Sequence, residues 1–177
     1  MMIRDNAMKS MFNKMRGNGA LPARPGWQQM IAGLIGGSLG IGLIAVLAHA
    51  HNLPLLMAPF GATCVLLFAA PDTPLAQPRN VIGGHLVSSL VGLIFLKYVG
   101  ASPVEMGLAV GVAIALMQAT RTLHAPAGAD PLVVLMSGKA GWSFLFAPVF
   151  ASAVILVTVA IVVNNVGQNR QWPRYWF

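Results

Sequence analysis

Two short stretches of this sequence combine proline and glycine inside otherwise apolar segments. The first, Ala58–Ala62, reads APFGA, and the second, Ala125–Ala129, reads APAGA, so four of five positions agree at an offset of 67 residues. Proline and glycine interrupt a helix, and a helix that begins inside a membrane leaves its first N–H groups unpaired. Such N–H groups, with the positive end of the helix dipole, favour a small anion. Breaks in corresponding positions of two halves therefore predict a transport site.

Polar and ionisable side chains near these breaks are candidates to line the pathway, because such groups inside membranes mark substrate or ion routes. His85 lies in the third apolar segment, His124 directly precedes the second break, and Asp130 follows it. Hydroxyl, amide and guanidinium groups close to the breaks complete the set. The predicted pathway residues are Pro59, Gly61, Thr63, Arg79, Asn80, His85, Ser88, Arg121, His124, Pro126, Gly128 and Asp130.

Several of these residues also have a purely structural interpretation. His85 can form a hydrogen bond that packs two helices together, and His124 can cap the backbone of the broken segment. Arg79 and Arg121 can be cytoplasmic anchors of the kind that the positive-inside rule describes. Asp130 can neutralise Arg121 or the next lysine instead of meeting a substrate. The sequence leaves both interpretations open.

No metal site or catalytic group of residues is indicated. His49 and His51 lie two residues apart, but no nearby carboxylate or thiol completes a metal site with them. The sequence shows no Ser-His-Asp set, phosphate loop or nucleotide fingerprint. Cys64 is the single cysteine, which excludes a disulfide within the chain. We therefore expect no enzymatic activity, no cofactor and no metal ion.

The elements that must position these residues are set by a composition typical of a membrane protein. Of the 177 residues, 56% are hydrophobic and 8% are charged, and the mean hydropathy is +0.72. Soluble domains carry about 25% charged residues. The net charge of +7 is concentrated near the two ends of the chain, which indicates membrane topology and excludes nucleic acid as the expected partner.

Apolar segments of sufficient length alternate with the two breaks, since a spanning helix needs about 20 residues. We expect an all-α fold, a polytopic transmembrane helical bundle with four full spans and two short helices broken by proline and glycine. The full spans are expected at about residues 27–48, 81–98, 104–122 and 142–163, and the broken segments at about 53–70 and 132–138.

The repeated break divides the expected transmembrane domain, residues 27–165, into two structural repeats. Repeat 1 covers about residues 27–99 and repeat 2 about 103–165. A basic cytoplasmic arm, 1–26, precedes this domain, and a cytoplasmic tail, 166–177, follows it.

Glycines at positions 33, 36, 37 and 40 form two pairs with a spacing of four residues, which lets another helix approach closely. That contact is either internal or between subunits. A homo-oligomer is expected, because a chain of this size has little room for a sealed pathway of its own.

Lysine and arginine positions test the number of crossings. If the N-terminus is cytoplasmic and each repeat crosses three times, nine basic residues lie inside and two outside. If each broken segment dips in and returns, the split is eight to three. The positive-inside rule favours six crossings, which make the repeats inverted, whereas four make them parallel. We expect an integral protein of the bacterial inner membrane with a cytoplasmic N-terminus.

Two longer stretches resemble the HPP family of small integral membrane proteins, which is named for a His-Pro-Pro motif. They read APFGATCVLLFAAPDTPLAQPRNVIGGH at residues 58–85 and HAPAGA at 124–129, and the resemblance covers about residues 27–163. In the naming motif Ala125 replaces the middle proline, while the histidine and the last proline are retained. The family is described with four transmembrane helices, and its members in chloroplasts and cyanobacteria are associated with nitrite transport.

The residues and the resemblance together predict a small-anion transporter or channel, with nitrite as the leading candidate. The partners expected are a small anion, the lipid bilayer and further copies of the chain. The alternative is a membrane scaffold or sensor that transports nothing and whose repeats only pack helices. One observation distinguishes these functions. A water-accessible cavity lined by both breaks would favour transport, and breaks sealed by apolar side chains would favour a scaffold.

Overall fold

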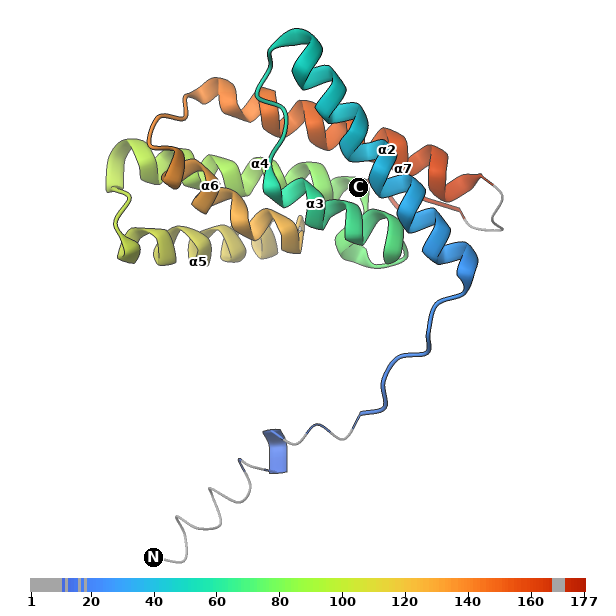
Figure 1. Ribbon diagram of the computed structural model, residues 1–177. Helices are drawn as coiled ribbons and strands as arrows, with labels where there is room; N and C mark the ends of the chain where they lie inside the picture. The colour runs from blue at the N-terminus through green and yellow to red at the C-terminus, as the bar shows by residue number, and fades with distance from the viewer. Residues whose placement is uncertain (1–10, 12, 16, 18, 167–170) are drawn as a thin grey trace, which may run out of the picture.

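The computed structural model describes residues 11, 13–15, 17, 19–166 and 171–177. Every regular element within that part of the chain is helical, which confirms the all-α fold class (Figure 1). The longer helices are α2 (Trp27–His51), α4 (Pro78–Ile94), α5 (Pro103–Ala119) and α7 (Ala151–Asn165). The shorter elements are α3 (Ala58–Cys64), η1 (Val65–Ala69), η2 (Pro74–Ala76), η3 (Phe95–Val99), η4 (Ala125–Ala129), α6 (Asp130–Ser137), η5 (Trp142–Leu145) and η6 (Phe146–Phe150).

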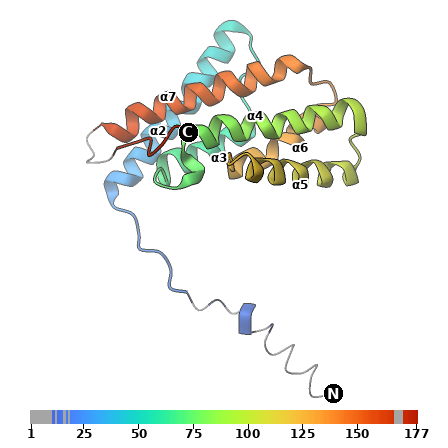
Figure 2. The same ribbon diagram turned by 180° about the vertical axis from the view of Figure 1, so that it is seen from behind.

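The helices run between two ends of an elongated bundle, as the two opposite views show (Figures 1 and 2). Arg79 donates to the backbone carbonyls of Thr120 and Arg121, which places the start of α4 beside the end of α5; we call this the arginine end. The Lys97 ammonium lies 5.5 Å from the ring centroid of Trp142, which places the end of η3 beside the start of η5; we call this the lysine end. Consequently α4 runs opposite to α5 and α7.

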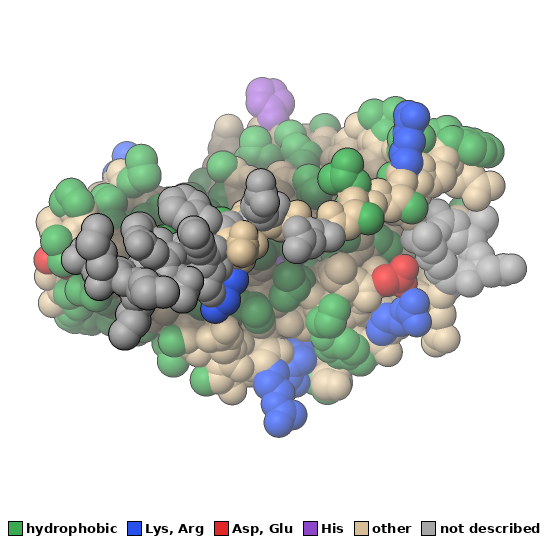
Figure 3. Space-filling view, turned by 90° about the horizontal axis from the view of Figure 1, so that it is seen from below, with side chains coloured by type: hydrophobic (Ala, Val, Ile, Leu, Met, Phe, Trp, Pro, Cys, Tyr) green, Lys and Arg blue, Asp and Glu red, His purple; other side chains and the backbone are tan. Residues whose placement is uncertain are grey.

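Three helical stretches are long and apolar enough to cross a membrane: Trp27–His51, Pro78–Val99 and Trp142–Asn165. The fourth expected span is the shorter apolar helix Pro103–Ala119. Large hydrophobic side chains are exposed along the long helices, among them Leu34 at 70%, Val104 at 68% and Val162 at 58%. In the described part of the face seen in Figure 3, charged side chains form only small groups. An integral membrane protein accounts for this surface.

The last of these stretches is not one regular helix as the sequence predicted. Ala147 has extended dihedrals, φ −135° and ψ 115°, so the chain bends between η5 and α7. It precedes Pro148, and the residue before a proline is restricted away from helical geometry.

The backbone repeats locally at the two Pro/Gly breaks. Met57 and His124 are extended residues with φ of −130° and −134°, and each directly precedes a helical start, at Ala58 and Ala125. They are 67 residues apart, which is the offset of the sequence repeat. From these starts α3 continues toward the arginine end and α6 toward the lysine end, in opposite directions (Figure 1).

Local chemistry explains the ends of several helices. Ser102 and Glu105 form a capping box at the start of α5, in which the Ser102 N–H donates to Glu105 Oε2 at 2.8 Å. Pro103 occupies the first turn, where its missing N–H is not needed. α6 ends at Gly138, whose φ of +66° is readily adopted by glycine.

The glycine pairs of α2 make different contacts. A Cβ atom at Gly36 would lie 2.3 Å from the Phe68 ring, and one at Gly40 would lie 2.9 Å from Leu156. This pair therefore packs inside the chain, against η1 and α7. A Cβ atom at Gly33 or Gly37 would meet nothing within 4 Å.

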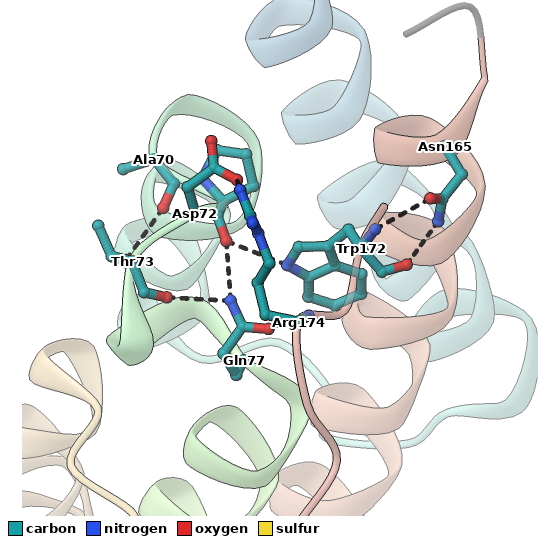
Figure 4. Close-up of polar contacts among 8 residues, drawn as sticks. Ala70, Asp72, Thr73, Gln77, Asn165, Trp172 and Arg174 are labelled. Atoms are coloured by element: carbon teal, nitrogen blue, oxygen red, sulfur yellow. Dashed lines mark hydrogen bonds and ion pairs between the residues drawn. The ribbon is translucent and has the colours of Figure 1, made fainter. Parts of the chain in front are cut away.

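The expected C-terminal tail packs back onto the bundle in its described part, residues 171–177, which we call the C-terminal clasp (Figure 4). Trp172 is 4% exposed, and its indole N–H donates to the Pro71 carbonyl at 3.2 Å. Arg174 forms an ion pair of 2.7 Å with Asp72. The clasp therefore ties the end of the chain to the link between η1 and α4. Parts of the expected arm, residues 1–10, 12, 16 and 18, lie outside the described residues.

Candidate functional site

The two broken segments meet in the middle of the bundle, against α4. α3 contacts η4, and α4 contacts both η4 and α6. The side chains that converge are Thr63 of α3, His85 of α4, His124 directly before η4, and Asp130, the first residue of α6. All four are 0% exposed. We call these residues the central cluster.

Hydrogen bonds join the central cluster into one continuous chain. Asp130 Oδ2 lies 2.7 Å from His85 Nδ1, and His85 Nε2 lies 2.8 Å from the Thr63 hydroxyl oxygen. The same oxygen lies 3.0 Å from His124 Nε2, and His124 Nδ1 lies 2.7 Å from the Leu75 carbonyl oxygen. One hydroxyl group therefore connects two imidazole rings.

Two serines of α4 extend these contacts. Ser89 donates to Asp130 Oδ2 at 3.1 Å, and this is the same oxygen that contacts His85 Nδ1. Ser88 donates to the Ala127 carbonyl of η4 at 2.6 Å. The second carboxylate oxygen, Asp130 Oδ1, is buried without a hydrogen-bond partner among the described residues. The serines therefore fix both the backbone of the second break and the carboxylate that follows it.

Ring contacts and a glycine hold the two histidines together. The ring centroids of His85 and His124 lie 4.9 Å apart and those of Phe60 and His85 5.0 Å apart, both in edge-to-face geometry. A Cβ atom at Gly84 would lie 2.6 Å from His124 Cβ and 2.8 Å from the Thr122 carbonyl oxygen. The missing side chain therefore permits the close approach of α4 to the segment that carries His124.

A second polar feature lies at the arginine end. Arg79, Arg121, Tyr175 and Phe177 line a surface hollow of about 330 Å³, which we call the arginine hollow. Arg79 Nη2 donates to the Thr120 carbonyl at 3.0 Å, so its guanidinium is held in place by the end of α5. Two permanent positive charges at one hollow attract anions.

A family model describing the HPP transmembrane region matches residues 22–173 of the chain. The chain belongs to the HPP transmembrane family. Two curated transmembrane proteins of Dictyostelium discoideum are similar to it, at 39% identity over 148 residues and 34% over 177 residues. The matches cover 76% and 94% of this chain but 52% and 57% of the relatives, so the chain spans about half of their length. No solved structure matches the chain.

The naming motif of the HPP family lies at the central cluster. His124, its histidine, contacts Thr63 and Leu75, and Pro126 is buried in η4. Ala125, which replaces the middle proline, is exposed and belongs to none of the cluster contacts. The departure from His-Pro-Pro therefore leaves the hydrogen-bonded chain intact.

The structure divides the predicted pathway residues into three groups. The first lies in or directly on the central cluster: Pro59, Thr63, His85, Ser88, His124, Pro126 and Asp130. The second lies at the arginine end: Arg79, Asn80 and Arg121. The third consists of Gly61 and Gly128, where an added Cβ atom would meet nothing within 4 Å, so no close contact requires glycine at either position.

The contacts of Asp130 and of two backbone amides also bear on the predictions. Asp130 pairs with His85, so the interpretation in which it neutralises Arg121 or the next lysine is wrong. The amides at the breaks are bonded locally: Phe60 N–H donates to the Met57 carbonyl, and Ala127 N–H to the His124 carbonyl, both at 3.1 Å. These two N–H groups are therefore not open to an anion in this conformation.

Sequence reasoning missed Ser89, Phe60 and Tyr175. Ser89 follows a predicted site residue, and only the rotation of α4 shows that both serines point inward. Tyr175 donates to Asn80 Oδ1 at 3.1 Å from the C-terminal clasp. Among the described residues, no group of three or more His, Cys, Asp or Glu side chains is placed to bind a metal ion.

Proposed function

We propose that this HPP protein transports a small anion, with nitrite as the leading candidate. The observation that carries the proposal is the convergence of both Pro/Gly breaks on the central cluster, inside an otherwise apolar bundle. Buried ionisable groups are costly in a membrane and occur where substrates or ions pass. Paired broken helices of opposite direction occur at the substrate sites of many transporters. The association of the family with nitrite supports the choice of candidate.

We propose six crossings, with the repeats inverted. Gln29, near the start of α2, donates to the Phe68 carbonyl at 2.6 Å, so the first broken segment ends where α2 begins. A segment that dipped in and returned would end beside the other end of α2. The arginine end is then cytoplasmic, together with the N-terminus, and the host membrane is the bacterial inner membrane.

We propose that the arginine hollow attracts the anion on the cytoplasmic side. The hollow lies where Arg79 contacts the end of α5, and the segment from there to His124 leads to the central cluster. Arg121 has a left-handed φ of +57° at the turn after α5. The described conformation is the closed one, and passage requires α3 and η4 to separate.

We propose that the transporter is a homo-oligomer. Gly33 and Gly37 on α2 and Gly107 and Gly111 on α5 have space for another helix backbone. Native mass spectrometry of the detergent-solubilised protein tests this, and a monomer at all concentrations contradicts it.

We propose no enzymatic role, although Asp130, His85 and Thr63 are connected in the order of a nucleophilic triad. A nucleophile must reach its substrate. The Thr63 hydroxyl is 0% exposed and already contacts His85, His124 and the Pro59 carbonyl. It connects two histidines instead of facing a reacting group.

A membrane sensor or scaffold that transports nothing is the second candidate, and complete burial of the central cluster favours it. In that function the cluster only locks the two breaks together. Its substitution would then alter stability without affecting any flux.

Flux in proteoliposomes tests the proposed function. Purified protein is reconstituted, and the uptake of nitrite, nitrate, formate and chloride is compared with protein-free vesicles. We expect nitrite uptake above the control, and reduced uptake after Arg79→Gln plus Arg121→Gln, with Lys139→Gln at the lysine end as the matched control. If none of the four anions moves faster than in protein-free vesicles, the sensor or scaffold function is favoured.

A further inference from the structure

We propose that Asp130, His85, Thr63 and His124 form a proton relay that passes one proton between the two histidines and delivers it to the anion of a weak acid crossing with it. The inference rests on the proposed transport function and adds its coupling ion and substrate class. It is carried by the contacts of the central cluster, whose Thr63 hydroxyl lies 2.8 Å from one imidazole nitrogen and 3.0 Å from the other.

The position of one proton follows from the Leu75 carbonyl. A carbonyl oxygen only accepts hydrogen bonds, so His124 Nδ1, at 2.7 Å, carries a hydrogen. In neutral His124 the other nitrogen, Nε2, is then an acceptor, and it requires the hydrogen of the Thr63 hydroxyl. That hydroxyl has one hydrogen, for which the Pro59 carbonyl oxygen at 3.1 Å competes with His124 Nε2 at 3.0 Å. The relay starts from the arrangement in which the hydrogen points at His124.

The position of a second proton, on His85, follows from the contacts of the same Thr63 hydroxyl. If Thr63 donates to His124, it can only accept from His85, so His85 Nε2 carries a hydrogen. A further hydrogen lies between His85 Nδ1 and Asp130 Oδ2, which are 2.7 Å apart. Asp130 and His85 together therefore hold one proton more than a carboxylate and a neutral imidazole. This makes the buried pair neutral, which avoids an isolated buried charge.

The same number of protons permits a second arrangement. His85 Nε2 gives its hydrogen to Thr63 Oγ1, while the Thr63 hydroxyl gives its own hydrogen to His124 Nε2. The O–H bond that remains on Thr63 then points at His85, and the positive charge has moved from His85 to His124. No other atom needs to move, and Asp130 remains the counter-charge. The titratable groups that face the relay are His85 of α4, His124 before η4 and Asp130 of α6, while α3 contributes the hydroxyl.

This relay selects the class of substrate. In the coupled step, the Nε2–H bond of His124 breaks and its proton binds an oxygen of the weak acid's anion, which leaves as the neutral acid. The Thr63 O–H then turns back toward His124, and a hydronium ion from the side of entry protonates His85 Nε2, which restores the Asp130–His85 pair. Nitrite and formate accept a proton in this way, whereas nitrate and chloride, the anions of strong acids, do not. A neutral acid also avoids the cost of moving a charge through the apolar bundle.

Nitrogen-15 NMR of the full chain in bilayers tests the relay without any transport. His49 and His51 are exposed, and replacing both with glutamine leaves His85 and His124 as the labelled histidines. We expect a hydrogen on His85 Nε2 in the wild type and exchange of that hydrogen with His124, lost in Thr63→Val and kept in Thr63→Ser. If both rings carry hydrogen only on Nδ1, the relay is overturned.

Flux measurements with a pH-sensitive dye inside the vesicles test the coupling. We expect one proton to enter with each nitrite or formate, and no entry of nitrate or chloride. Because proton-transfer groups contribute about 100-fold to rates, Thr63→Val should slow uptake by that order, and Thr63→Ser by much less. Ser152→Ala is the matched control, since it removes a buried hydroxyl that donates to the Leu55 carbonyl instead of to the relay.

The outcomes separate the two proposals. Nitrite uptake without protons, or equal uptake of nitrate, overturns the coupling while the transport function stands. If no anion moves, transport and coupling are both wrong, and the NMR spectra still decide whether the relay exists. Thermal unfolding of each variant shows whether a lost flux reflects a lost fold.

Discussion

At the scale of single residues, the central cluster depends on the buried contact between Asp130 and His85. Asp130 and His85 are both 0% exposed, and their contact of 2.7 Å is the only ion pair of the cluster among the described residues. The free-energy cost of removing each group from water is offset by its contact with the other group and by the hydrogen bond from Ser89 to Asp130. Removing one partner leaves a polar group buried without compensation, which costs more than removing both.

We therefore predict a strong coupling between His85→Leu and Asp130→Leu. His85→Leu alone should lower the free energy of unfolding by about 3–5 kcal/mol, because breaking a buried pair leaves one charge unpaired. The double variant should recover part of that loss. Chemical denaturation in detergent micelles, followed by tryptophan fluorescence, measures all four corners of the cycle. Strictly additive losses would show that the two groups do not pair.

These residues show which features of the site could be predicted from the sequence. The rule that ionisable groups in apolar segments are functional candidates selected His85, His124 and Asp130 one by one. It gave no means of pairing them, because Thr63 and His124 are 61 positions apart and meet only when α3 packs against η4. The local turns were not predictable either: the Phe60 N–H at the start of α3 and the Ala127 N–H in η4 are bonded to nearby carbonyls. Open N–H groups near Thr63 and Gly128 remain a prediction.

At the scale of elements, the cluster exists because α4 approaches the second break without a side chain between them. Gly84 is that contact point, where a Cβ atom would lie 2.6 Å from His124 Cβ. The helix breaks and the all-helical class could be predicted from proline, glycine and the apolar segments. The internal role of Gly36 and Gly40, in contrast to Gly33 and Gly37, depends on which face of α2 meets η1.

We predict that Gly84→Ala destabilises the protein by about 1–3 kcal/mol, because overpacking forces the backbone at Thr122 and His124 to move. Gly42→Ala is the matched control. It lies in the interior of α2 with nothing within 4 Å of a new Cβ atom, and alanine is the better helix former by up to about 1 kcal/mol. Thermal unfolding in micelles compares the two. Equal effects would contradict the close approach of α4 to the second break.

The C-terminal clasp gives a second prediction about elements, in which burial decides the magnitude. Trp172→Ala removes a side chain that is 4% exposed, and should cost about 3–5 kcal/mol of the free energy of unfolding. Arg174→Gln removes an ion pair whose side chains are 59% and 52% exposed, and should cost less than about 1 kcal/mol. Tryptophan-independent circular dichroism melts measure both. A larger loss for Arg174→Gln than for Trp172→Ala would contradict this order.

At the scale of the whole molecule, the basic residues of the bundle lie near its two ends. Arg79 and Arg121 lie at the arginine end, and Lys97 lies at the lysine end near Trp142. With six crossings this places the larger basic group on the cytoplasmic side, in agreement with the positive-inside rule. With four crossings the first broken segment would return to its own side, and α4 would be inverted in the membrane.

Side-specific labelling separates these topologies. Cys64 is the single cysteine and is buried, so a Cys64→Ala background carries one new cysteine at a time. Asp72→Cys probes the exposed link before α4, and Lys97→Cys probes the other end of the same stretch. With a cytoplasmic N-terminus, a membrane-impermeant maleimide added to intact cells should label position 97 and not position 72. After the cells are opened, both should react, which controls for accessibility. Labelling of position 72 alone in intact cells would show that α4 has the opposite orientation in the membrane. With a cytoplasmic N-terminus, that result would exclude the six-crossing topology, and the arginine hollow would not lie on the cytoplasmic side.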